Sequence, residues 1–143
     1  MIHFELVTLN GKKFGDSVYE VLLPTPQGQI AVFPHHMPLV SLASPGVIKV
    51  RVKQNDPDDF MKVYATNGGV IEVTDNQVRV LVDEADSSDE INQQEAAKAH
   101  QEALELRKNA KDLVSLDKAQ AMIDRTSTRL KVAELKRHRS RTR

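Results

Sequence analysis

The sequence contains no cysteine and no tryptophan, and aromatic residues make up only 4% of its 143 residues. The lack of cysteine excludes disulfide bonds, zinc sites built from thiolates, and cysteine nucleophiles. Because aromatic rings are scarce, any core must be built mainly from aliphatic side chains. Hydrophobic residues still account for 40% of the chain, which is enough for one domain, or for one small domain with an appendage.

Long apolar runs are also missing. No stretch of about 18 apolar residues exists that could span a membrane. The N-terminus lacks a basic leader followed by an apolar run, so we expect no signal peptide and an intracellular, soluble protein. The net charge of zero conceals an asymmetry, because residues 1–90 carry a net charge of −6 and residues 91–143 a net charge of +6. Such an asymmetry suggests two units with different partners.

The first half of the chain alternates apolar and polar residues in the manner of β-strands. This alternation predicts strands at 2–8, 17–23, 47–53, 60–66, 69–74 and 77–83. Within the single strand predicted at 17–23, Tyr19, Val21 and Leu23 share one face. Turn signals rich in glycine, proline and asparagine separate the segments, and a hairpin is predicted to turn at Asp75-Asn76. Short strands at this spacing favour a β-sandwich or barrel.

The second half changes to a helical period near residue 87 and contains neither glycine nor proline. Ser87 and Glu90 are predicted to form a capping box. A short linker at 111–115 predicts two helices that pair antiparallel, so we expect a β-domain at 1–86 and a helical hairpin at 87–143. Small and apolar residues form a seam on each helix at 3-4 spacing: Ala96, Ala99, Ala103, Leu106 and Ala110, then Leu116, Ala119, Ile123, Thr126, Leu130 and Ala133. Four of the five seam residues on the first helix are alanine, so we expect a hairpin that is folded but weakly closed.

Motifs for catalysis and for cofactor binding are absent from the sequence. Neither a Gly-rich phosphate loop nor an H-E-x-x-H metal motif occurs. The adjacent His35 and His36 are expected to point to opposite faces of an extended segment, so we do not expect them to bind one metal ion together. No nucleophile elbow surrounds Ser41 or Ser44. We therefore expect no catalytic, cofactor-binding or metal-binding residues, although a small enzyme with a site in the sandwich is the alternative to test.

The basic tail at 136–143 (KRHRSRTR) supports a different alternative. Its positive charge could contact nucleic acid or an anionic lipid surface, which would make the protein an adaptor. No aromatic residue accompanies the tail for stacking on bases. A charged helix end in solvent is therefore the simpler interpretation, and nucleic acid is not an expected partner.

Three segments resemble one known family. The stretch GQIAVFPHHMPLVSLASPGVIKV (28–50) resembles the N-terminal signature of the epsilon subunit of F-type ATP synthases. The stretch NGGVIEVTDNQVRVLVDEA (67–85) is similar to the second strand-rich segment of that family, and RLKVAEL (129–135) to its C-terminal helix. The resemblance runs over nearly the whole chain. It implies an α+β protein, with an N-terminal ten-stranded β-sandwich followed by an antiparallel two-helix hairpin.

The resemblance also implies a function. Members of this family are non-catalytic rotor subunits of the central stalk, and they couple proton flow to ATP synthesis by linking the gamma subunit to the ring of c subunits. The interface residues that it assigns here are Gln29, Pro34, His36 and Pro38. Proline fixes φ and removes a hydrogen-bond donor, so Pro34 and Pro38 would hold His36 in a preset shape. Gln29 stands where the family often has an acidic residue.

The hairpin corresponds to the regulatory element of the family, which can extend and block ATP hydrolysis through transient contact with the catalytic beta and alpha subunits. The residues implied for contact with an acidic segment are Arg125, Arg129, Lys131, Lys136 and Arg137. Some bacterial members bind ATP in the folded hairpin, but only Ala119 matches their motif when it is aligned to residues 114–119. No cofactor is therefore expected. The implied location is peripheral, at the cytoplasmic face of the bacterial inner membrane or the equivalent organellar face.

Overall fold

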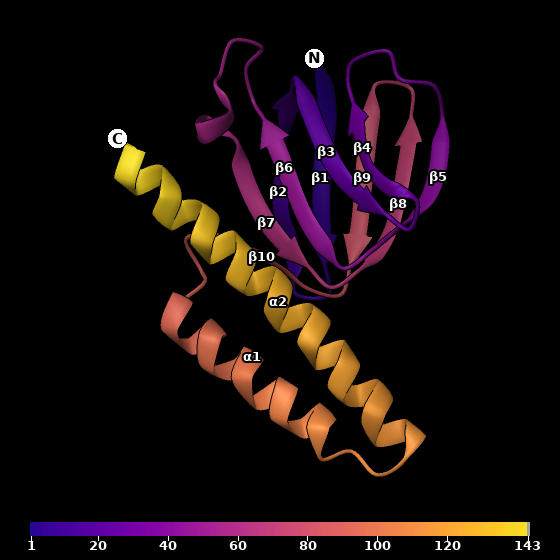
Figure 1. Ribbon diagram of the computed structural model, residues 1–143. Helices are drawn as coiled ribbons and strands as arrows, with labels where there is room; N and C mark the ends of the chain where they lie inside the picture. Colours follow the sequence, from indigo (N-terminus) through magenta and orange to yellow (C-terminus); the bar gives the residue numbers. More distant parts are fainter. Residues whose placement is uncertain (143) are drawn as a thin grey trace.

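The computed structural model describes residues 1–142, and the side chains of residues 1–136. Ten strands form two sheets of five strands each, and two helices follow them (Figure 1). Sheet A has the strand order β2 (Gly11–Val18), β1 (Ile2–Thr8), β9 (Gln77–Val82), β8 (Gly69–Thr74), β5 (Leu39–Ala43). Sheet B has the order β10 (Ala85–Ser87), β7 (Lys62–Thr66), β6 (Gly46–Arg51), β3 (Glu20–Thr25), β4 (Gly28–Val32). The ten-stranded sandwich that the resemblance implied is confirmed.

The core of the sandwich lies between the two sheets and is almost entirely aliphatic. Alternate residues point inward, so that Ile2, Phe4 and Leu6 of β1 are fully buried while His3 and Glu5 between them reach the outer face. Ile48 of β6 faces them from sheet B, and Ile71 of β8 lies on the same inner face of sheet A, in one continuous cluster of residues between 2 and 85. The core therefore depends on the strands alone and includes no residue of the helices.

The segment 17–23 is not the single strand that the alternation predicted. β2 ends at Val18 in sheet A, and β3 begins at Glu20 in sheet B. The chain crosses between the sheets at Tyr19, so the inward-facing positions change phase and Val18, Val21 and Leu23 are all fully buried. The prediction that Tyr19 shares a face with Val21 and Leu23 is wrong, because alternation holds only within one sheet.

The hairpin predicted at Asp75-Asn76 is confirmed. It joins β8 to β9, with Thr74 opposite Gln77, and Asn76 adopts the left-handed conformation at φ 54° that such a turn requires. At the other end of the same ladder, a Cβ atom on Gly69 would overlap the backbone of Leu81, so only glycine fits this position.

The first helix begins later than predicted, and the second begins inside the predicted linker. α1 extends over Gln93–Lys108, and its N-cap is Asn92, whose side-chain oxygen accepts hydrogen bonds from the backbone amides of Gln94 and Glu95. Ser87 is the last residue of β10, so the predicted capping box is wrong. Glu90 does accept a hydrogen bond from the backbone amide of Ser87, but it does so in a turn. A four-residue connection leads to α2 (Leu113–Thr142), which lies antiparallel to α1 (Figure 1).

The predicted seam between the helices is confirmed in its central part and wrong near the tip of the hairpin. The buried seam residues are Ala96, Ala103, Ala119, Ile123, Thr126 and Ala133. Leu106 is 52% exposed, and it lines a groove of about 520 Å³ together with Ala119 and Met122. The small alanine side chains do not fill the space between the helices there, so the larger residues remain in contact with solvent.

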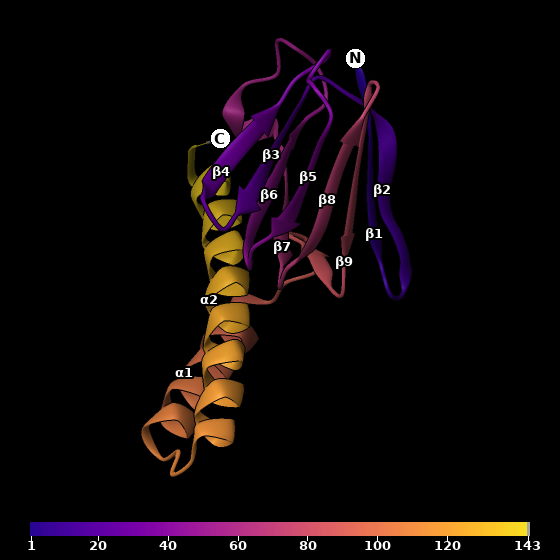
Figure 2. The same ribbon diagram turned by 90° about the vertical axis from the view of Figure 1, so that its right-hand side faces the viewer.

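The C-terminal part of α2 packs on the outer face of sheet B. Val132 is fully buried, and it belongs with Ala133 to a small cluster that includes Val63 and Ala65 of β7. Figure 2 shows α2 beside sheet B, whereas β1 and β2 lie on the far side of the sandwich. Within the described residues, neither helix is apolar enough over a sufficient length to cross a bilayer. Sheet A thus keeps one face free of the helices.

Candidate interaction sites

The loop at 33–38 joins the edge strand of sheet B to the edge strand of sheet A and carries three of the predicted interface residues. His35 adopts a left-handed conformation at φ 67°, and its backbone amide donates a hydrogen bond to the side-chain oxygen of Asn76 at 3.2 Å. His36 places its ring Nδ1 2.6 Å from the carbonyl oxygen of Met37. This arrangement gives the loop between Pro34 and Pro38 a preset shape and leaves the Met37 side chain exposed.

The two histidines do not converge on a common ligand position. The backbone amide of His35 bonds to the β8–β9 turn, and the ring of His36 turns to the backbone carbonyl of Met37. Among the described residues, no group of three or more His, Asp or Glu side chains is arranged to hold a metal ion. The geometry of the loop therefore suits a shaped surface.

Gln29 lies apart from the other predicted interface residues. It is exposed on β4, where it pairs with Pro24 next to the β3–β4 turn. The 33–38 loop leaves the opposite end of β4, and a strand of this length spans about 16 Å. Figure 1 shows the turn and the loop at opposite ends of the strand. The family resemblance implied one surface that contains both Gln29 and Pro34, but these two residues do not form one compact patch.

The outer face of sheet A carries an apolar patch that the sequence reading missed. We define the sheet A patch as Val40, Leu42, Val70 and Leu81, all of which are exposed. Leu42 of β5 is opposite Val70 of β8, and Val70 is opposite Leu81 of β9, so three of them form a row across the strands. The sequence does contain a signal for this patch, because β5, β8 and β9 have apolar residues on both faces, whereas a strand with one solvent-exposed face normally has them on one.

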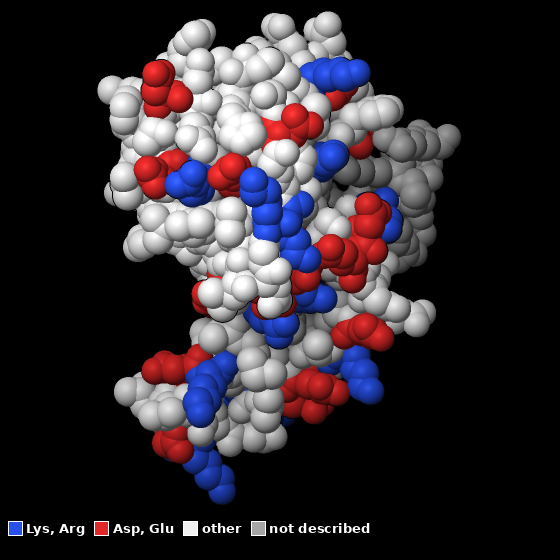
Figure 3. Space-filling model, turned by 180° about the vertical axis from the view of Figure 1, so that it is seen from behind, with Lys and Arg blue, Asp and Glu red and all other residues white. Residues whose placement is uncertain are grey.

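A charged cluster lies beside this patch on the same face. Glu5 accepts hydrogen bonds from Lys12 at 3.2 Å and from Arg79 at 3.3 Å. The hydrogen bond from Lys12 makes the largest contribution to lowering the pKa of Glu5 from 4.5, and contacts with His3 and Arg79 act in the same direction. Figure 3 views this side of the molecule and shows charges of both signs beside an area that has neither. An apolar area with a polar rim is the usual anatomy of a protein interface.

The basic residues predicted on the second helix meet acidic residues at the end of the sandwich. Arg125 donates two hydrogen bonds to the carboxylate of Glu84, at 2.8 and 2.6 Å. Arg129 pairs with Asp86 and lies 3.5 Å from Glu84. Glu84 lies just before β10 and Asp86 lies within it, so both carboxylates sit where the sandwich meets α2.

The pKa values of the two carboxylates shift in opposite directions. The hydrogen bonds from Arg125 hold the pKa of Glu84 below 4.5, although partial burial opposes them. Burial raises the pKa of Asp86 above 3.8, and the charge of Arg129 offsets only part of this effect. Of the two carboxylates, Glu84 is therefore the one whose charged form is favoured by its arginine partner in the closed hairpin.

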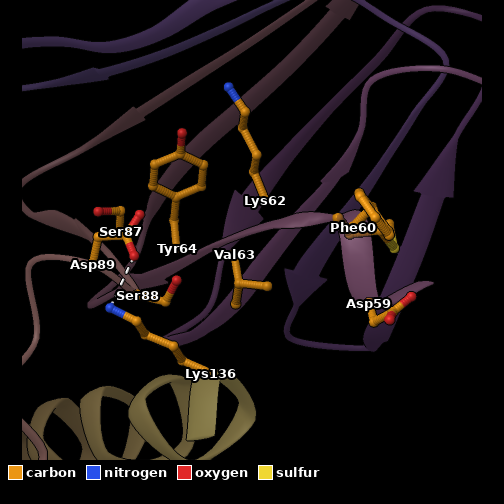
Figure 4. A pocket seen from close by; sticks show the side chains of 10 residues that line it. Asp59, Phe60, Lys62, Val63, Tyr64, Ser87, Ser88, Asp89 and Lys136 are labelled. Carbon is orange, nitrogen blue, oxygen red and sulfur yellow. Dashed lines mark ion pairs between the residues drawn. The ribbon is translucent and has the colours of Figure 1, made fainter. Parts of the chain in front are cut away.

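Lys136 joins Arg125 and Arg129 as a paired cation of α2, and within the described residues Lys131 does not. The Nζ atom of Lys136 lies 2.9 Å from Asp89, at one side of a groove of about 640 Å³ that Lys62 and Tyr64 also line (Figure 4). Lys131 is exposed and makes no ion pair with the described residues. Arg137 and the rest of the basic tail lie outside the residues whose side chains are described, so the adaptor hypothesis stays a prediction.

Comparison with known proteins supports the family that the three motifs indicated. A family model described as the beta-sandwich domain of the ATP synthase Delta/Epsilon chain matches residues 1–88. The ATP synthase epsilon chain of Herpetosiphon aurantiacus is 31% identical over 138 residues, which cover 96% of this chain and 98% of that relative. The epsilon chain of Syntrophobacter fumaroxidans is 33% identical over 93% of this chain and 96% of its own length.

Solved structures show the same fold. A chain in a structure of the Euglena gracilis mitochondrial ATP synthase, which contains OSCP, F1 and the c-ring, superposes with a TM-score of 0.77 at 21% identity. The match covers 89% of this chain and 78% of that chain. Because the family model covers more than half of the chain and the relatives match it over nearly their full length, the chain belongs to the ATP synthase epsilon-chain family, whose members are non-catalytic subunits of that enzyme.

Proposed function

We propose that this chain is the rotor subunit that links the gamma subunit to the ring of c subunits and so couples proton flow to ATP synthesis. As an epsilon chain it is a central-stalk subunit and performs no chemistry itself. The observation that carries the proposed linkage is the sheet A patch, which lies on the face of the sandwich that the helices leave free. A subunit that transmits torque needs a fixed contact with its neighbour.

The sheet A patch suits the gamma subunit as its occupant. Val40 is 74% exposed and Leu42 62% exposed, although both lie in a strand of a well-packed sheet. Soluble monomers rarely leave an apolar row of this kind uncovered, and an apolar centre with a charged rim is typical of a permanent subunit contact. The contact of Glu5 with Lys12 and Arg79 would form part of that rim.

The 33–38 loop and Gln29 then serve two different contacts. The loop leads directly into β5, whose Val40 and Leu42 belong to the sheet A patch, so we assign Pro34, His36 and Pro38 to the gamma contact. Gln29 lies at the other end of β4, and we assign it to the c-ring. Glutamine carries no charge, so this contact would rely on hydrogen bonds where an acidic residue would form an ion pair.

The helical hairpin at 87–143 would act as a regulatory unit separate from the sandwich at 1–86. In its open form it would offer Arg125, Arg129, Lys131, Lys136 and Arg137 to an acidic segment of the catalytic beta subunits, with transient contact to alpha, and so inhibit ATP hydrolysis. The closed form seen here keeps several of these residues at the sandwich. The whole subunit would lie at the cytoplasmic face of the bacterial inner membrane, or the equivalent organellar face, held there by its partners.

Co-purification with the gamma subunit tests the proposal. Leu42→Asp places a carboxylate in the sheet A patch on an outward-facing position, so the sandwich should fold while binding to gamma is lost. Leu113→Asp is the matched control, because Leu113 is also an exposed leucine but lies at the tip of the hairpin. Normal binding of the Leu42→Asp variant, or an equal loss in both variants, would contradict the assignment of the patch.

Coupled activity provides the second measurement. Membranes with the Leu42→Asp variant should hydrolyse ATP without driving proton uptake, since the catalytic subunits remain intact while the linkage to the c-ring weakens. Membranes with the Leu113→Asp variant should keep coupled proton uptake. If both variants pump protons equally well, the chain does not carry the linkage through this face.

A further inference from the structure

Three cations on α2 meet three carboxylates at the end of the sandwich. Arg125, Arg129 and Lys136 recur at spacings that place them along one side of a helix. Their partners Glu84, Asp86 and Asp89 follow one another from just before β10 into the turn after it. The two charged rows therefore run alongside each other at the junction of the two parts of the chain.

The geometry of the pairs differs from that of ordinary surface ion pairs. Arg125 grips Glu84 with two nitrogens, and Arg129 reaches both Asp86 and Glu84, so the four groups form a connected network. The Arg129 and Asp86 side chains are three-quarters or more shielded from solvent. Bidentate and networked pairs are the ones that contribute measurably, whereas isolated exposed pairs contribute little.

The network flanks a small apolar contact. Val132 and Ala133 of α2 pack against Val63 and Ala65 on sheet B, one turn beyond Arg129. Apolar contacts hold surfaces together without fixing their register, whereas forked arginine–carboxylate bonds fix both position and orientation. The charged network therefore determines which face of α2 meets the sandwich.

We propose that Glu84 and Asp86 form a latch that keeps the hairpin closed, because they bind in the closed hairpin the same arginines that the open hairpin offers to an acidic partner. This inference rests on the proposed function of the hairpin. When the hairpin opens, Arg125 and Arg129 leave the carboxylates of Glu84 and Asp86 and bind those of the partner segment instead. A partner segment opens the hairpin only if its carboxylates compete with those of the sandwich, so the latch sets the threshold for inhibition.

Charge reversal and charge exchange in the full-length chain test the latch. The chain has no cysteine, so a pair of spin labels at Gln27→Cys and Lys118→Cys reports the distance between sandwich and hairpin without background. We expect Glu84→Arg and Arg125→Glu each to lower the ratio of closed to open chains by about tenfold, because attraction becomes repulsion. The double variant that exchanges the two charges should recover the closed state to within about threefold of the parent, since the pair is restored.

Matched controls separate the latch from a general effect of charge. Lys131→Glu makes the same change as Arg125→Glu on the same helix, and Glu102→Arg makes the same change as Glu84→Arg on the hairpin, but neither residue belongs to the network. Both controls should leave the ratio unchanged. A control that opens the hairpin as far as its counterpart, or an exchange variant no more closed than the single variants, would overturn the latch.

Competition with hexaglutamate probes the exchange directly. The peptide should open the parent chain in a concentration-dependent manner, and raising salt to about 1 M should open it as well, because the Debye length falls to about 3 Å. The charge-exchanged variant presents a glutamate at position 125 and should resist the peptide. A parent chain that stays closed in both conditions contradicts the latch.

ATP hydrolysis by the reconstituted enzyme distinguishes the latch from the proposed function. Glu84→Arg keeps every basic residue of α2, so it should strengthen inhibition if the open hairpin inhibits. A Glu84→Arg chain that opens in the distance measurement and yet leaves hydrolysis unchanged supports the latch and overturns the regulatory role. A Glu84→Arg chain that remains closed overturns the latch, whatever the rate of hydrolysis.

Discussion

The ring nitrogen Nδ1 of His100 on α1 lies 2.9 Å from the hydroxyl oxygen of Thr126 on α2. The hydroxyl of Thr126 donates to the carbonyl oxygen of Met122 at 2.7 Å, so the ring nitrogen must be the donor in the contact with Thr126. No other side-chain hydrogen bond joins the two helices within the described part of the chain. A polar contact in a seam of small residues can fix how the helices align along their length.

Thr126→Val removes this contact with little change in shape. It leaves the Nδ1–H group of His100 without an acceptor in a partly buried position, and we expect the hairpin to lose about 1 kcal/mol of stability. Thr128→Val is the matched control, because the hydroxyl of Thr128 also donates to a carbonyl of its own helix but makes no contact with α1. Chemical denaturation followed by helical circular dichroism measures the difference. Equal losses in the two variants would show that the contact with His100 contributes nothing.

Ala103→Leu tests how closely the helices approach each other. Ala103 is fully buried, and the larger side chain should cost about 1–3 kcal/mol through overpacking. Ala97→Leu on the exposed side of α1 should change stability by less than about 0.5 kcal/mol. Hydrogen exchange of the α1 amides should accelerate only in the Ala103 variant, and unchanged exchange would mean that the seam is loosely packed.

Truncation after residue 88 tests the proposed division into two units. The sandwich core contains residues from 2 to 85 only, so the shortened chain should still fold and bind gamma. Its denaturation should show a single cooperative transition. Loss of the helices uncovers Val63 and Ala65, and the resulting cost should stay near 2 kcal/mol because few methyl groups are exposed. A truncated chain without a cooperative transition would show that the hairpin is part of the folding unit.

Protonation of Glu84 should open the hairpin in acid. Its pKa is lowered in the closed state, so its contribution to closure is complete above 4.5 and is lost as the pH falls through the lowered value. The pKa of Asp86 is raised, so proton uptake there favours closure and offsets part of the loss. The distance measurement between pH 7 and pH 3 should therefore show acid opening in the parent and in Glu102→Gln, and much less in Glu84→Gln. Parallel curves for all three chains would exclude Glu84 as the titrating group.

Nucleotide should not bind to the isolated chain. Among the residues of α2 whose side chains are described, the arginines are Arg125 and Arg129, and Glu84 and Asp86 already engage both of them. Lys118, nearer the start of α2, lacks the planar fork with which arginine holds phosphate. Isothermal titration with Mg-ATP should show no saturable heat at sub-millimolar concentration. A clear isotherm that Arg125→Ala abolishes would contradict this expectation.

The sequence contains enough information to predict most strands, but it does not reveal the sheet to which each one belongs. Alternation identified β1, β6, β8 and β9, because each stays within one sheet and buries one face. The chain changes sheets at Tyr19, where no glycine, proline or asparagine marks the crossing. Tertiary pairing at that point, with Tyr19 donating its amide to Arg51 across the sheet, determines the phase of the side chains that follow.

The interaction sites were predicted less completely than the fold. The basic residues of α2 were identified, but their partners were not, although Glu84, Asp86 and Asp89 lie in one acidic stretch of sequence. Val132 illustrates why the partners of α2 could not be predicted. The helical period indicates that Val132 faces away from the seam between the helices, but only the three-dimensional structure shows that sheet B lies on that side. A pattern identifies which side of a helix is apolar and leaves open what covers it.

The parallel pairing of β1 with β9 has a consequence for how the chain is made. β1 leaves the ribosome first, but one of its two neighbours in sheet A is separated from it by all of β2 to β8. Ile2, Phe4 and Leu6 therefore have no complete cover until β9 has been synthesised, so the sandwich closes late and nearly all at once. Because α2 packs on a sheet that must already exist, the hairpin docks last, and a newly made subunit passes through an undocked state before it first reaches its closed form.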